Sequence, residues 1–118
     1  MAIVTTHTLN SVDGTHAAGI GVTLLCIGPD GQRNIVFESE TDAEGRLSQT
    51  VDVASGRAGC DYELVFRTGA YFDKQALPAP AKQILKDVVI RFSMPDPTAS
   101  YHIPLMLAPN SYSVWWSS

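Results

Sequence analysis

Turn-forming residues divide this chain into short segments, and their spacing limits the possible fold more than any other feature of the sequence. Clusters of Gly, Pro, Asp and Asn recur along the chain, in VDGTHAAG, GPDGQRN, TDAEGR, ASGRAG, PAPA, MPDPTAS and APNS. The runs between these clusters are mostly shorter than ten residues. Many short strands at this spacing predict a β-sandwich or a β-barrel.

Eight of these runs are predicted strands and one is a predicted helix. The segment 69–77 lacks strand alternation, and its larger side chains fall at near-helical spacing before Pro78, which would end a helix. The sequence therefore predicts an all-β fold with one short helix. The predicted strands are residues 3–9, 20–27, 34–38, 46–51, 62–67, 88–92, 101–107 and 111–116.

The size and composition of the chain indicate one domain that associates with copies of itself. A chain of 118 residues is expected to fold as a single domain over residues 1–118. Only 17% of its residues are charged, although 45% are hydrophobic. This low charge content suggests that part of the surface is covered in an oligomer.

The charge distribution argues against large anionic partners. The net charge is −4, the acids are scattered, and Lys and Arg form no cluster, so neither nucleic acid nor a membrane surface is an expected partner. The apolar runs are too short to span a bilayer. The opening MAIVTTHTLN lacks the features of a secretory signal, so a cytoplasmic location is expected.

Alternation along two strands places polar side chains on their outer faces. His102 alternates with apolar residues and is predicted to point away from the core, as is Arg46. His7 lies between two threonines, so the pattern leaves its face undecided. The residues assigned to the core are Tyr101, Ile103, Leu105 and Leu107 in one strand, with Leu47, Val51 and Val53 in and after the other.

The residues that could carry chemistry are few. The chain has three histidines, of which His16 lies in a predicted turn and is interpreted as a turn residue. No G-x-S-x-G motif is present, and the histidines lack the spacing of a zinc site. The segment 42–45 is predicted to be a turn in which Gly45 positions Arg46. A histidine in a strand is more often structural than catalytic. His7 and His102 therefore become catalytic candidates only where other evidence supports them.

Three motifs resemble those of 5-hydroxyisourate hydrolases, which belong to the transthyretin-like family. THTLN and DGTHAAGIGVTL are similar to the start of that family, with His7 at its first catalytic histidine. TDAEGR resembles the turn that ends in the active-site arginine, here Arg46. YHIPLMLAPNSYS resembles the C-terminal signature, with His102 at the second catalytic histidine. The resemblance covers essentially the whole chain.

The resemblance implies a transthyretin-like sandwich of two sheets and seven to eight strands, assembled as a homotetramer with its sites at subunit interfaces. It also implies a small heterocyclic substrate, 5-hydroxyisourate, whose ring amide is opened by water without a metal or another cofactor. His7 and His102 are assigned jointly to water activation and proton delivery. Arg46 can bind substrate oxygens and stabilise the oxyanion.

The end of the chain departs from the family pattern. Family hydrolases end in Tyr-Arg-Gly-Ser, whereas this chain ends in Trp115, Trp116, Ser117 and Ser118, which we expect to bind substrate. Replacing arginine by Trp116 removes a cation and supplies an apolar face, which favours a heterocycle with a more apolar portion. Two alternatives remain: a non-catalytic transthyretin-like protein that binds a small ligand, and tryptophans that pack at a dimer interface.

Overall fold

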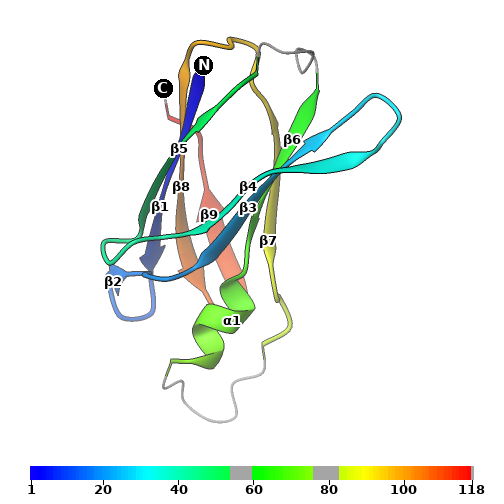
Figure 1. Cartoon of the computed structure of the whole chain (residues 1–118). Coiled ribbons are helices and arrows are strands. Elements are labelled where there is room, and N and C mark those ends of the chain that lie inside the picture. The colour runs from blue at the N-terminus through cyan, green and yellow to red at the C-terminus, as the bar shows by residue number, and fades with distance from the viewer. Residues whose placement is uncertain (54–59, 76–82, 118) are drawn as a thin grey trace.

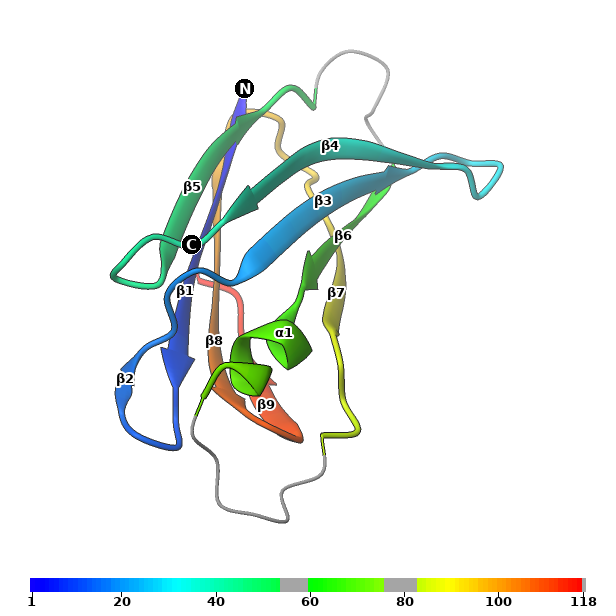
Figure 2. The ribbon, with the colours of Figure 1, turned by 60° about the horizontal axis from the view of Figure 1, so that its bottom comes forward.

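The computed structural model describes residues 1–53, 60–75 and 83–117, which form two β-sheets and one short helix (Figure 1). The sheets pack as two layers, and the helix lies at one end of them (Figure 2). The predicted all-β sandwich with one short helix is therefore confirmed. In chain order the elements are β1 (Ala2–Asn10), β2 (Thr15–His16), β3 (Gly21–Ile27), β4 (Arg33–Glu40), β5 (Arg46–Val51), β6 (Asp61–Phe66), α1 (Thr68–Asp73), β7 (Val88–Ser93), β8 (Ser100–Ala108) and β9 (Ser111–Val114).

Strand β1 lies in the interior of the first sheet. One of its sides pairs antiparallel with β5 along most of its length and with β2 at its end. Its other side pairs in parallel with β8, which pairs in turn with β9. In Figure 1, β1 is blue and β8 is orange, and their pairing brings segments near the two ends of the chain side by side. The second sheet has the order β4-β3-β6-β7.

The core lies between the two sheets and follows the predicted alternation. The four apolar residues assigned to the inner face of β8 are all buried, and His102 lies half-buried on the outer face. In β5, Leu47 and Val51 are buried and Arg46 is exposed. Both predicted face assignments are therefore confirmed.

Buried threonines decide the face of β1, which its sequence pattern leaves open. Thr6 and Thr8 point into the core, where the Thr6 hydroxyl donates to the carbonyl oxygen of Ile103 at 2.7 Å. The Thr8 hydroxyl donates to the carbonyl oxygen of Ala17 at 2.8 Å. Because each buried hydroxyl has an acceptor, its desolvation costs little. His7, between these two residues, therefore points outward.

Three elements differ from those predicted. Strand β2 forms within a segment interpreted as a turn, because Gly14 reverses the chain with a positive φ of 77°. Helix α1 ends at Asp73 and buries Thr68, Gly69 and Phe72. Residues 76 and 77, the last two of the predicted helix, lie outside the described residues. Strand β9 ends at Val114 rather than at residue 116. No helix in the described part of the chain is long and apolar enough to cross a membrane.

Gly45, in the turn before Arg46, is expected to be the most sensitive of the turn glycines. It has a φ of 73°, and a Cβ atom there would collide with the carbonyl oxygen of Thr8. We expect Gly45→Ala to lower the free energy of unfolding by about 3 kcal/mol, from the left-handed backbone and the collision together. Urea unfolding followed by tryptophan fluorescence measures this change.

Gly31→Ala is the matched control for this prediction. Gly31 also has a positive φ, of 81°, but a Cβ atom there meets nothing within 4 Å. Gly31→Ala should therefore lower the free energy of unfolding by only about 1 kcal/mol, the cost of the backbone conformation alone. Equal losses in the two variants would show that the contact with Thr8 is unimportant.

Candidate active site

The outer face of the first sheet brings the predicted catalytic residues together. His7 on β1 lies opposite Arg46 on β5. Two residues earlier, Thr5 lies opposite Ser48 on β5 and opposite His102 on β8. Side chains at such positions lie on the same face of a sheet, within reach of one another. Three segments far apart in the sequence therefore contribute to one patch.

A cavity of about 280 Å³ opens on this patch, between β1, β5 and β8. Arg46 and His102 both line it, and His7 lies beside Arg46, outside the lining. The cavity is at the small end of the range for ligand pockets, so it suits a small heterocycle. Its lining residues are Thr5, Thr6, Asp42, Arg46, Leu47, Ser48 and His102.

His102 is held at both its ring and its backbone. Its Nδ1 atom lies 2.8 Å from the hydroxyl oxygen of Thr5. Its backbone N–H donates to the carbonyl oxygen of Ser117 at 3.2 Å, and the N–H of Ser117 donates to the His102 carbonyl at 2.8 Å. A threonine hydroxyl can donate or accept, so the ring can adopt either tautomer. No described residue hydrogen-bonds to Nε2, which is the ring nitrogen left to exchange a proton.

The turn between β4 and β5 positions Arg46. The Asp42 carboxylate accepts hydrogen bonds from the backbone N–H groups of Glu44 and Arg46, each at 2.9 Å. The hydrogen bond from Arg46 is the largest cause of the lowered pKa of Asp42; desolvation, the next largest, opposes it, and the bond from Glu44 adds to the lowering. Asp42 therefore stays ionised beside the cavity and holds the backbone that carries the guanidinium group.

His7 forms a hydrogen bond with a residue that the sequence analysis interpreted as part of a turn. Its Nε2 atom lies 3.1 Å from Nδ1 of His16, and the ring centroids are 5.2 Å apart. Desolvation is the largest cause of a lowered pKa at His7, followed by the positive charge of Arg46. A backbone hydrogen bond to Glu44 opposes this shift. His7 is therefore neutral at neutral pH.

The sequence carries a hairpin signal just before His16. Asp13-Gly14 is a hairpin turn signal. A two-residue hairpin there would pair Val12 with Thr15. In the structure the loop spans residues 11–14, which pairs Asn10 with Thr15 and Leu9 with His16 and makes His7 and His16 diagonal neighbours on one face. The interpretation of His16 as a turn residue overlooked this pairing.

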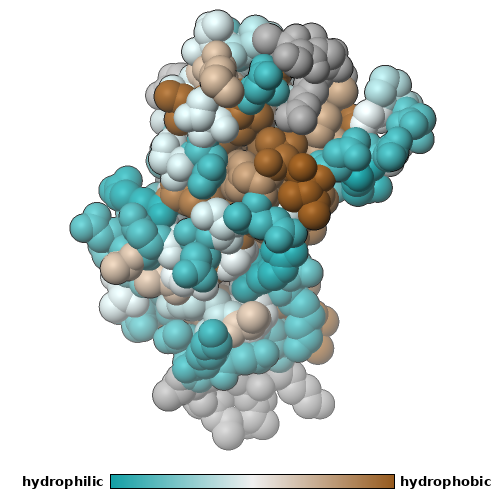
Figure 3. Space-filling view, in the orientation of Figure 1, coloured by the Kyte–Doolittle hydropathy of each residue, from teal (hydrophilic) through white to brown (hydrophobic). Residues whose placement is uncertain are grey.

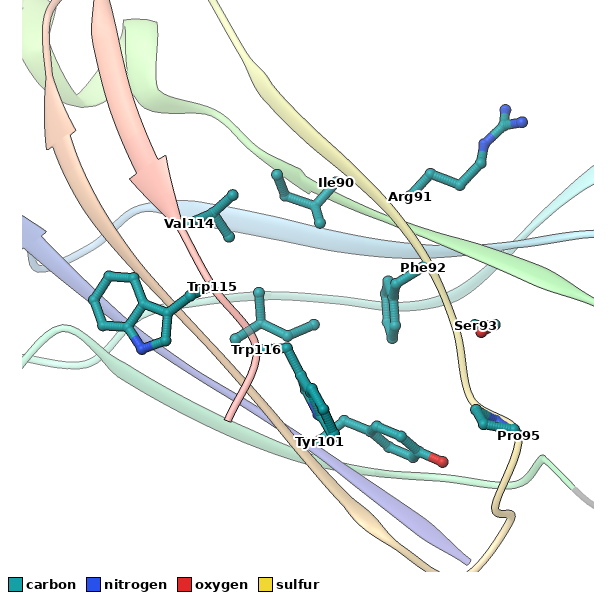
Figure 4. Close-up of a pocket in the computed structure, with 10 residues that line it drawn as sticks. Ile90, Arg91, Phe92, Ser93, Pro95, Tyr101, Val114, Trp115 and Trp116 are labelled. Atoms are coloured by element: carbon teal, nitrogen blue, oxygen red, sulfur yellow. The ribbon is translucent and has the colours of Figure 1, made fainter. Parts of the chain in front are cut away.

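The predicted substrate-binding tail is divided between two regions. Ser117 lies beside His102, whereas Trp115 and Trp116 line a groove of about 440 Å³ at the open edge of the sandwich, between β7 and β9. Figure 4 shows Trp116 directed towards Tyr101, with Trp115 on the other side of the chain. Alternation explains the position of Trp116, which precedes Ser117 and projects to the opposite side, but not that of Trp115, which has the same parity as Ser117. Ser118 lies outside the described residues.

Possible metal ligands are not grouped in the described ranges. Within residues 1–53, 60–75 and 83–117, no three His, Cys, Asp or Glu side chains are placed to hold a metal ion together. The imidazole of His102 and the guanidinium group of Arg46 at the cavity, with the imidazole of His7 beside Arg46, can transfer protons and stabilise a developing negative charge.

Comparison with known proteins identifies the family of this chain. The 5-hydroxyisourate hydrolase of Halalkalibacterium halodurans is 34% identical over 115 residues, covering 98% of this chain and 97% of the relative. That of Caulobacter vibrioides is 36% identical over 121 residues, covering both chains fully. The Klebsiella pneumoniae 5-hydroxyisourate hydrolase structure superposes with a TM-score of 0.76 at 26% identity, also over the full length of both chains.

Transthyretin shares the fold at lower identity. The structure of transthyretin from Sparus aurata superposes with a TM-score of 0.81 at 22% identity, covering 97% of this chain and 95% of that protein. A model of the HIUase/Transthyretin family matches residues 4–116. The chain therefore belongs to the HIUase/transthyretin family.

Proposed function

We propose that this chain is a hydrolase that opens a cyclic amide by water attack, with 5-hydroxyisourate as its substrate. The observation that carries the proposal is the placement of Arg46 and His102 around one small cavity, with His7 alongside. Curated relatives that span the full chain are 5-hydroxyisourate hydrolases, which supports the same reaction. The activity that names these relatives and this geometry point to one chemistry.

The proposed reaction begins with a water molecule between His102 and the ring carbonyl. The water oxygen forms a bond to the carbonyl carbon while its proton passes to Nε2 of His102. Arg46 stabilises the negative charge that develops on the carbonyl oxygen, because its guanidinium group is always charged and presents several donors. When the carbon–nitrogen bond breaks, the same proton passes from His102 to the leaving nitrogen. No redox step or cofactor is required.

The two histidines, assigned jointly from the sequence, have different surroundings. We assign proton exchange to His102, because it lines the cavity and its Nε2 has no partner among the described residues. His7 lies beside Arg46 with its own Nε2 already paired with His16. We therefore assign His7 to the support of Arg46 and of the substrate oxygens near it.

The tail suggests a finer proposal about the substrate. Ser117 forms a β-bridge with His102 and holds its backbone, so the two side chains lie on the same face of the sheet. Trp115 and Trp116 supply an apolar surface at the neighbouring edge. If a substrate extends from the cavity around this edge, it carries an apolar portion. A heterocycle related to 5-hydroxyisourate is therefore the second substrate class that we propose.

A second candidate function is the binding of an apolar ligand without catalysis. The specific observation that favours it is the groove of about 440 Å³, whose lining includes Phe92, Tyr101 and both tryptophans. An aromatic ligand would quench tryptophan fluorescence there. Quenching without hydrolysis of any cyclic amide would favour this candidate over the hydrolase.

We also propose that the chain works in the cytoplasm as a homotetramer, with its sites at subunit interfaces. The support is the low charge content together with large apolar side chains that are exposed in the single chain. Ile3 and Met106 lie on the outer face of the sheet that carries the site, 39% and 43% exposed. Figure 3 shows a further apolar area over the second sheet. Light scattering of the purified chain measures the assembly.

The first prediction of the hydrolase proposal concerns His102. Wild type should accelerate the ultraviolet decay of freshly generated 5-hydroxyisourate, and His102→Ala should lower kcat/KM by about 10²- to 10⁴-fold, the usual contribution of a general acid–base group. Glu38→Gln, an exposed change on β4 of the other sheet and outside the cavity lining, is the control and should keep wild-type activity. Equal activity of wild type and His102→Ala would contradict the assignment.

The second prediction concerns the tail. Truncation after Val114 removes both backbone hydrogen bonds to His102, so kcat/KM should fall by about ten- to a hundredfold through misplacement of the ring. Trp116→Arg alone should stay within about threefold of wild type, because residue 116 projects into the groove. A clear gain of 5-hydroxyisourate hydrolysis in Trp116→Arg would instead place residue 116 in the substrate site, as the sequence comparison suggests.

A further inference from the structure

His7 has two polar partners that the proposed reaction does not use. Its Nε2 atom lies 3.1 Å from Nδ1 of His16. The backbone of Glu44 acts on the same ring as an acceptor and favours its charged form. With Nε2 paired to His16, Nδ1 is the nitrogen left to donate to Glu44.

These partners determine the position of the protons on both rings. A carbonyl oxygen can only accept, so a hydrogen on Nδ1 of His7 is the arrangement that suits the Glu44 backbone. In the neutral ring Nε2 is then an acceptor, and Nδ1 of His16 must donate to it. Charging His7 would place a hydrogen on Nε2 and force His16 to change tautomer or lose the bond. The pair therefore favours neutral His7.

The hairpin that carries His16 is itself held at several points. The Asp13 carboxylate accepts hydrogen bonds from the backbone N–H of Thr15 at 3.0 Å and from its hydroxyl at 2.7 Å. After His16, the N–H of Ala17 donates to the Thr8 carbonyl at 2.9 Å, and the Thr8 hydroxyl donates to the Ala17 carbonyl at 2.8 Å. His16 lies between these two anchors, so its ring is presented to His7 from a defined backbone.

Charged groups from each neighbouring element face His7. Arg46 on β5, His16 on β2 and His102 on β8 all disfavour a positive charge on it. The Asp42 carboxylate, in the turn before β5, acts in the opposite direction. A charged His7 would repel the guanidinium group of Arg46, on which the proposed reaction depends. A neutral His7 leaves that cation free to bind substrate oxygens.

We propose that His16 is a positioning residue of the site: its Nδ1–H donates to Nε2 of His7 and so holds His7 as a neutral imidazole beside Arg46. The catalytic consequence of this role rests on the proposed function. The hydrogen-bonding arrangement itself does not, because it is a property of the resting protein.

The first test reads the pair directly, without substrate. Two-bond ¹H–¹⁵N correlation spectra of the ¹⁵N-labelled full chain resolve the rings of its three histidines, which single substitutions assign. At pH 8 we expect hydrogen on Nδ1 of both His7 and His16. Hydrogen on Nε2 of His7 would overturn the proposal.

Titration of variants separates the hydrogen bond from general disturbance of the hairpin. His16→Ala removes the donor that favours the neutral ring, so the pKa of His7 should rise. His16→Asn retains an amide donor near the same place and should raise it less. Val12→Ala, an exposed change in the same hairpin, should leave it unchanged. Equal pKa values for His7 in wild type and His16→Ala, or equal rises in His16→Ala and His16→Asn, would overturn the proposed role.

Activity provides the second test and distinguishes the two proposals. A raised pKa charges His7 at higher pH, so the acidic limb of kcat/KM for 5-hydroxyisourate should move to higher pH in His16→Ala. At pH 8 the loss should be no more than about fivefold, the effect of one neutral hydrogen bond. An active His16→Ala variant with the wild-type pH profile would overturn the role of His16 alone. An inactive wild type would overturn the proposed function, while the ring spectra would still decide the His7–His16 arrangement.

Discussion

The pairing of β1 on both of its sides is the constraint on which the candidate site depends. β5 on one side places Arg46 opposite His7, and β8 on the other places His102 opposite Thr5. A shift of either partner by one residue would turn its polar side chains into the core. Buried Thr6 and Thr8, whose hydroxyls require carbonyl acceptors on neighbouring segments, oppose such a shift. The core of the sandwich thus determines the geometry of the outer face.

The end of the chain acts on the site through its backbone as well as its side chains. Two hydrogen bonds between His102 and Ser117 continue the sheet beyond β9 and hold the strand that carries the imidazole. Alternation then separates neighbouring tail residues, with Ser117 beside His102 and Trp116 in the groove at the sandwich edge. Replacing the side chain of Trp116 can therefore alter the groove at the sandwich edge, while the backbone hydrogen bonds that hold His102 at the smaller cavity stay the same.

The sequence was sufficient for several features because each depends on local pattern. Alternation placed Arg46 and His102 outside the core, since a pleated strand turns successive side chains to opposite faces. Gly45 was expected in a conformation that other residues resist, and it has a φ of 73°. Spaced motifs indicated the family, and the comparisons show it. The roles of individual site residues and the tetramer stay predictions.

The tertiary structure decided what local pattern could not. His7 has polar neighbours on both sides, so only the packing of those threonines against other segments shows that it points outward. The contact between His7 and His16 depends on hairpin register, and the position of Trp116 depends on where the tail pairs with β8. The sequence by itself determined the fold class and the faces of regular strands, because alternation is a property of each strand. Register, tail placement and the open edge of the sandwich came from the structure, because they depend on contacts between segments far apart in the chain.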